Sequence, residues 1–234
     1  MRNAPTSLAL AALMVGVCSM SAVAHRLIDD DGTHATPENA IVLEDFELSQ
    51  VVYHEVTPTS IELWFSFAAQ PGQTLYWEFG LPAMESLTDY RPVMAVLGPG
   101  LPAIELPIDT PEGLGGFIVG GEDAELDFFF EQFTGTNSWI LSSDEQTIAQ
   151  AGTYYVVAFH PEDALGKFWV AIGKREEFNL NDVITYADTV AFVRDYHEDS
   201  AAPLSALNIG LLALSYAAQV LFGPILWVLG LLGF

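Results

Sequence analysis

The chain has 234 residues, with 31 Asp and Glu against 7 Lys and Arg and a formal net charge of −24. This charge would repel the phosphates of nucleic acids, so nucleic acid is excluded as a partner. The excess of carboxylates leaves three interpretations open: a well-solvated surface, weak sites for divalent cations, or docking to a basic partner.

Residues 1–24 have the features of a secretory signal peptide. A basic residue precedes an apolar stretch over residues 8–17, and residues 22–24, Ala-Val-Ala, fit a signal peptidase cleavage site. Cleavage there would leave His25 as the first residue of an exported protein. The one cysteine, Cys18, would leave with the signal peptide, so the mature chain is expected to contain no disulfide.

Residues 25–38 carry an acidic run at 29–31 and show no apolar periodicity. A segment of this kind predicts a flexible leader, with the folded body beginning at residue 39.

Short apolar runs with a period of two residues fill the region 39–178 and predict a domain made mainly of β-strands. Residues 61–67 and 75–79 alternate in this way, and the Pro and Gly between them predict a hairpin or at least neighbouring strands. Further runs, separated by turn residues, follow at 91–98, 116–119, 126–133, 137–142, 152–159 and 166–172. The spacing predicts an antiparallel β-sandwich or jelly roll, in which the runs that are apolar on both faces are central strands.

Residues 179–200 predict an amphipathic helix, over 180–196, followed by an acidic turn. This helix is expected to pack on the sandwich or to rest near a bilayer. One helical face collects six apolar residues: Leu180, Val183, Ile184, Ala187, Val190 and Ala191.

Residues 204–234 contain no charged side chain and predict a C-terminal transmembrane helix. A span takes about 20 residues, so the segment is long enough to tilt or to break near Pro224. Because the signal peptide sets the orientation, the domain is expected on the periplasmic or extracellular side of the membrane.

No signature of a common enzyme class is present, so no catalytic residue is assigned. If His25 becomes the first residue, its amine and imidazole could chelate copper. The carboxylates at 122–127 could bind Ca²⁺, which prefers oxygen ligands, as could the run at 29–31. In each case the alternative is a solvated segment without a ligand. The candidate metal ligands are His25, Glu122, Asp123, Glu125 and Asp127.

Four aromatic residues raise the alternative of carbohydrate binding, because sugars stack on flat rings. They are Trp64, Tyr76, Trp139 and Trp169. The competing interpretation is that these rings fill the core of the sandwich.

Five short motifs resemble exported bacterial modules of the pre-peptidase C-terminal type, in which a G-Q-x-hydrophobic strand is paired with a later G-T-Y strand. The resemblance covers residues 45–173 and implies a β-sandwich that assists secretion or binding. The motifs are Ser-Gln-Val-Val-Tyr at 49–53, Gly-Gln-Thr-Leu-Tyr at 72–76, Leu-Gly-Pro-Gly at 97–100, Ala-Gly-Thr-Tyr-Tyr at 151–155 and Gly-Lys-Phe at 166–168.

These patterns together predict a non-enzymatic, membrane-anchored module outside the cytoplasm. It is expected to bind a protein partner, through its helix or a face of the sandwich, or to serve a membrane complex. A module that binds Ca²⁺, copper or carbohydrate is the alternative.

Overall fold

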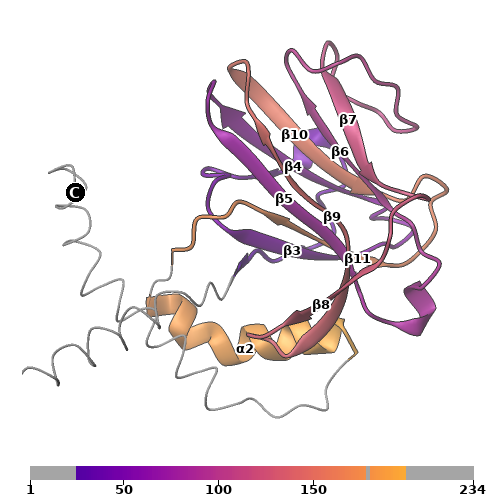
Figure 1. Cartoon of the computed structure of the whole chain (residues 1–234), viewed down its shortest axis with the longest axis vertical. Helices are drawn as coiled ribbons and strands as arrows, with labels where there is room; N and C mark the ends of the chain where they lie inside the picture. Colours follow the sequence, from indigo (N-terminus) through magenta and orange to yellow (C-terminus); the bar gives the residue numbers. More distant parts are fainter. Residues whose placement is uncertain (1–24, 178–179, 199–234) are drawn as a thin grey trace, which may run out of the picture.

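The structure is a computed structural model that describes residues 25–177 and 180–198. Two β-sheets face each other, and one long helix, α2 (Leu180–Tyr196), lies outside the sandwich (Figure 1). The prediction of a mainly β, sandwich-like domain with one helix is confirmed. Two short 3₁₀ turns, η1 (Pro37–Asn39) and η2 (Glu85–Leu87), lie in connections.

The first sheet has six strands in the described part of the chain, and its neighbours are antiparallel except for the parallel pair β1–β3. In spatial order the strands are β1 (Arg26–Leu27), β3 (Gln50–Glu55), β11 (Lys167–Ile172), β5 (Thr74–Pro82), β9 (Thr136–Thr147) and β8 (Asp127–Glu131).

The second sheet has five strands, and its one parallel pair is β2–β4. In spatial order the strands are β2 (Ile41–Val42), β4 (Glu62–Ala69), β10 (Gly152–Phe159), β6 (Val93–Gly98) and β7 (Gly115–Gly120). Each of the six later runs predicted from the sequence overlaps one strand of the two sheets.

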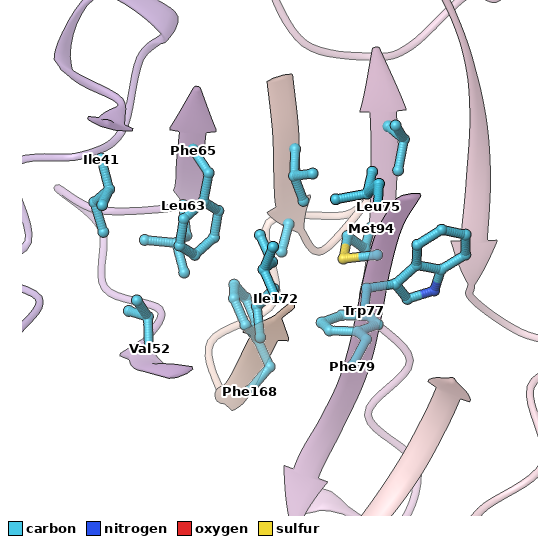
Figure 2. Packing of buried hydrophobic residues seen from close by; sticks show 14 of the residues in the cluster. Ile41, Val52, Leu63, Phe65, Leu75, Trp77, Phe79, Met94, Phe168 and Ile172 are labelled. Carbon is cyan, nitrogen blue, oxygen red and sulfur yellow. The ribbon is translucent and has the colours of Figure 1, made fainter. Parts of the chain in front are cut away.

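The hairpin predicted between residues 61–67 and 75–79 is wrong, because β4 and β5 belong to opposite sheets. Their alternating apolar residues do point inward, and Figure 2 shows Leu63 and Phe65 of β4 in one cluster with Leu75 and Trp77 of β5. Two strands that face each other across a core show the same alternation of apolar and polar residues as two strands of a hairpin, so the sequence pattern does not distinguish the two arrangements. The connection crosses between the sheets instead of folding back, and it is held by the Gly72 N–H, which donates to the Ile148 carbonyl at 2.9 Å.

Central strand β10 is buried on both faces, as its apolar sequence predicts. Val156 and Ala158 belong to the core between the sheets, whereas Val157 and Phe159 belong to a second cluster on the outer face of the five-stranded sheet. The connection at 99–114 covers this outer face with apolar residues of its own. The sheet is therefore enclosed from both sides, and its outer face is not a free surface at this point.

Residues 25–38, expected to be a flexible leader, are joined to the sandwich. Strand β1 pairs with β3, and the His34 carbonyl accepts the Trp64 N–H at 2.9 Å. Asp30 lies 2.6 Å from Nδ1 of His54, a fully buried residue of β3. The acidic composition suggested a solvated segment, but one of its carboxylates has a buried charge partner.

Helix α2 has the predicted length, but it buries a different face from the one expected. Val190 is buried as predicted, whereas Ile184 is 69% exposed and Ala187 is also exposed. Tyr186 and Tyr196 are buried instead because their hydroxyl groups find backbone acceptors. Tyr186 donates to the Phe133 carbonyl at 2.7 Å.

Tyr196 fastens the end of α2 to the centre of the six-stranded sheet. Its hydroxyl proton is shared between the carbonyl oxygens of His54, at 2.7 Å, and Phe168, at 2.8 Å. Tyr196→Phe is expected to lower the free energy of unfolding by about 1–3 kcal/mol, because a buried hydrogen bond is lost at constant shape. Chemical denaturation measures this, with Tyr155→Phe as the control, since no hydrogen bond of the Tyr155 hydroxyl occurs in the described residues. Equal losses in both variants would contradict the assignment.

Within the described residues, no helix combines the length and the apolar character needed to cross a membrane. The predicted signal peptide at 1–24 and the predicted transmembrane segment at 204–234 both lie outside those residues.

Candidate functional site

A cavity of about 220 Å³ lies between α2 and the outer face of the six-stranded sheet, and we name it the α2 cavity. Strand β1 and the connection between β8 and β9 form its other walls. The apolar part of its lining comes from Leu27, Val51, Tyr53, Phe133, Val190 and Val193. The ionisable part comes from His25, Arg26, Glu131, Glu177 and Asp182.

His25, a residue singled out from the sequence, borders this cavity. The parallel pairing of β1 with β3 brings it beside Ser49, whose hydroxyl oxygen lies 2.6 Å from His25 Nδ1. The other ring nitrogen, Nε2, lies 3.8 Å from the Glu78 carboxylate. The imidazole is thus held between a hydroxyl group and a carboxylate, both contributed by strands or strand ends of the six-stranded sheet.

Glu78 stays ionised although it is largely buried. Burial raises the pKa of this carboxyl, but the neighbouring His25, the hydrogen bond from Tyr76 and the charge of Lys174 lower it more, and the net pKa lies below the ordinary value. Glu78 is therefore an anion that supports the His25 side of the cavity.

Glu131, at the end of β8, behaves in the opposite way. Burial raises the pKa of its carboxyl, and the Phe133 N–H, which donates to Glu131 Oε1 at 2.8 Å, offsets this only in part. No basic side chain of the described residues forms an ion pair with it. The pKa of the Glu131 carboxyl group therefore lies above its ordinary value, and a cation bound nearby would lower it.

Arg26 carries the guanidinium group of the cavity. Its Nη2 donates to the Glu177 carbonyl at 3.2 Å and lies 3.6 Å from the Asp182 carboxylate at the start of α2. Its Nε is buried and has no hydrogen-bond partner in the described part of the chain. This charge links β1 to the helix that covers the cavity.

The contact between Ser49 and His25 has the residue types of a nucleophile and its base, but not their accessibility. Ser49 is only 2% exposed, and its hydroxyl oxygen is occupied by the imidazole inside the fold. A catalytic nucleophile must reach its substrate, so this pair is better explained as a support for His25.

The predicted calcium ligands Glu122, Asp123, Glu125 and Asp127 are exposed in the connection before β8 and at its first residue. The structure does not gather them into a group of three donor atoms, and calcium binding there stays a prediction. Three other side chains, Asp30, Asp31 and His34, do bring donor atoms within 4.8 Å of one another. Asp30 and Asp31 belong to the acidic run at 29–31, which is also a candidate for Ca²⁺ from its sequence.

The aromatic candidates for sugar stacking divide into two kinds. Trp64 and Trp169 are buried in the fold, so neither offers a face to a sugar. Tyr76 is half-buried, with Lys174 Nζ 4.1 Å from the centre of its ring, and Trp139 packs against the core. None of the four forms an open aromatic platform.

Sequence reasoning missed Glu131 and Asp182 as residues of the site. Each is one carboxylate among 31 in the chain, and nothing in its local sequence separates it from the solvated ones. They meet only because β8 and α2, about fifty residues apart in sequence, lie against the same cavity. One usable signal was the flanking of a strongly apolar strand by Asp127 and Glu131.

Comparison with known proteins adds a likeness of fold. No family model matches the chain, and no curated protein does. The pre-peptidase C-terminal domain of a Bacillus anthracis collagenase matches with 9% identity and a TM-score of 0.34, over 58% of this chain and 97% of that one. CorA, a surface-associated copper-binding protein of Methylomicrobium album BG8, matches with 7% identity and a TM-score of 0.30, over 65% of this chain and 100% of that one. The first of these structures is a domain of the type that the sequence motifs resemble.

Proposed function

We propose that this chain is a non-enzymatic, exported and membrane-anchored binding module whose α2 cavity holds a small organic cation. The observation that carries the proposal is Glu131, a carboxyl group turned into an apolar-walled cavity without an ion-pair partner in the described residues. A buried carboxyl group in such surroundings is stabilised as an anion when a cation arrives.

The charge of the lining favours the same sign of ligand. Three carboxylates, those of Glu131, Glu177 and Asp182, border the cavity against one guanidinium and one imidazole. Arg26 is already compensated by Asp182 at 3.6 Å, His25 by Glu78 at 3.8 Å, and Glu177 by Arg175 at 3.4 Å, which leaves the Glu131 carboxylate. The remaining charge is therefore negative, and an anionic ligand would be repelled.

Size limits the ligand to a small one. Sites for drug-sized molecules measure about 300–1,000 Å³, whereas the α2 cavity measures about 220 Å³. Its apolar side chains suit a short hydrocarbon body and its carboxyl groups suit an ammonium end. A short alkylammonium ion has both features.

The full chain in mild detergent is expected to bind propylammonium at least tenfold more tightly than 1-propanol, as measured by titration calorimetry. Glu131→Gln is expected to weaken propylammonium binding at least fivefold. The affinity should rise as the pH increases through the raised pKa of Glu131, because the carboxylate attracts the cation and the neutral acid does not. Binding should accordingly release protons in that range.

Glu125→Gln provides the matched control, because it removes a carboxylate from the exposed connection before β8 and leaves the cavity unchanged. Equal affinities for the amine and the alcohol, or binding that Glu131→Gln leaves intact, would rule out the cavity as a cation site.

Copper and calcium form the second candidate, because His25 borders the cavity beside Glu78. Titration of the same full chain with Cu²⁺ and Ca²⁺ separates this candidate from the first. Copper binding that is lost in His25→Ala, with propylammonium binding absent, would favour the metal.

A further inference from the structure

Strand β8 is the last strand of the six-stranded sheet in the described residues, and it exposes two large aromatic side chains. Phe128 is 67% exposed and Phe130 is 52% exposed. Large apolar side chains on a strand at the edge of a sheet mark a surface that pairs with another strand. Soluble domains usually avoid such an edge.

The two phenylalanines face the side of the sheet that elsewhere forms the core. Phe128 lies opposite Trp139 of β9, and Trp139 packs against the core cluster. The five-stranded sheet ends at β7, which contacts β9, so β8 extends beyond the cover of the opposite sheet. Phe129 and Glu131 point the other way, and Glu131 lines the α2 cavity.

Charge at the two ends of β8 argues against a second copy of this chain as the occupant. Asp127 and Glu131 flank the three phenylalanines. If two copies of β8 paired antiparallel about Phe129, Asp127 of each would lie opposite Glu131 of the other. Like charges directly opposite each other destabilise a strand pair, so self-pairing is disfavoured. The predicted membrane segment at 204–234 has no charge that could compensate the carboxylates.

We propose that β8 pairs with an extended segment of a partner protein in which basic and apolar residues alternate. The apolar residues of the segment would lie beside Phe128 and Phe130, and its basic residues would lie on the face that carries Asp127 and Glu131. The excess of carboxylates in the connection at 122–125 adds to the attraction. This surface shares Glu131 with the α2 cavity, but Phe128 and Phe130 lie on the opposite face of β8 and do not line that cavity.

A labelled heptapeptide of alternating Lys and Val tests the pairing, with binding to the full chain measured by fluorescence anisotropy. Replacement of its central Val by Pro is expected to weaken binding at least fivefold, because Pro lacks the N–H that a strand donates. The double variant Phe128→Ser and Phe130→Ser should weaken binding by a similar factor. Leu165→Ser, at another exposed apolar position, should leave it unchanged. Bound peptide should also slow the amide exchange of residues 127–131.

A chain of net charge −24 attracts any basic peptide, so the Pro peptide and the Phe variants decide the result. If both bind as tightly as their parents, the attraction is non-specific and the proposal fails. The proposal also fails if the Phe variants abolish self-association of the chain in size-exclusion chromatography and leave peptide binding intact. Propylammonium binding in the Phe variants reports separately on the cavity.

Discussion

Asp30→Ala is expected to lower the free energy of unfolding by about 3–5 kcal/mol, because it leaves a buried imidazole without its charge partner. His54 is 1% exposed, and its Nδ1 lies 2.6 Å from Asp30 Oδ2. Its Nε2 lies 3.2 Å from the Ser60 carbonyl oxygen. Both ring nitrogens therefore face oxygen atoms, and the Asp30 carboxylate is the partner of one of them. Urea denaturation monitored by tryptophan fluorescence measures the loss.

The effect should depend on pH in a defined direction. Burial raises the pKa of Asp30, but the His54 contact and the Gly32 N–H lower it more, and the net pKa lies below the ordinary value of 3.8. A lowered carboxyl pKa contributes stability that is present above the unfolded value and is lost as the pH falls through the folded value. The wild-type chain should therefore lose this contribution below about pH 4. The free energy of unfolding of Asp30→Ala should fall less steeply with pH in that range.

Asp31→Ala is the matched control, because its neighbouring carboxylate is 69% exposed and contacts only local groups in the described residues. Its cost should be much smaller than that of Asp30→Ala, because the Asp31 carboxylate is exposed to solvent. A loss in Asp30→Ala as small as in Asp31→Ala would mean that the segment 25–38 is not anchored through His54.

The sequence could predict the features that depend on residues close together in the chain, but not those that depend on distant contacts. Strands β4 and β5 show the difference. Alternation correctly predicted that Leu63 and Leu75 point to a core, since a strand's two faces follow from its own residues. It did not predict that they point toward each other from opposite sheets, because sheet membership is decided by contacts with distant strands. The helix over 180–196 is a second example. Its bounds could be predicted from its own residues, but its buried face depends on the distant carbonyl groups that the Tyr186 and Tyr196 hydroxyl groups reach.

The candidate site was predicted even less completely, because its parts come from four separate elements. The sequence singled out His25 because signal-peptide cleavage would give it a free amino group. The structure places Ser49 and Glu78 beside its ring and Glu131 in the same cavity. A dense acidic run such as 122–127 attracts attention in a sequence, but charge density does not direct carboxylates to one point. Glu131, which stands alone in the sequence, lines the cavity, whereas the carboxylates of the run at 122–127 are exposed to solvent.

Trp64→Ala is expected to lower the free energy of unfolding by about 3–5 kcal/mol, the cost of removing a large aromatic side chain from a packed interior. Trp64 is 0% exposed on the outer face of β4, where residues 99–114 and the Tyr155 ring cover it. Its indole N–H donates to Glu62 Oε2 at 2.5 Å. Thermal and urea denaturation should both report the loss.

Two further variants separate the reasons for this loss. Trp64→Phe keeps much of the ring but removes the N–H donor, so it should cost clearly less than alanine. Phe128→Ala removes an exposed ring and should change stability by no more than about 0.5 kcal/mol. If Trp64→Ala instead kept wild-type stability and lost only affinity for a glycan, the ring would be a sugar platform. Because Trp64 is buried beneath residues 99–114, we expect a loss of stability instead. Any loss of sugar binding would then follow from unfolding of the domain.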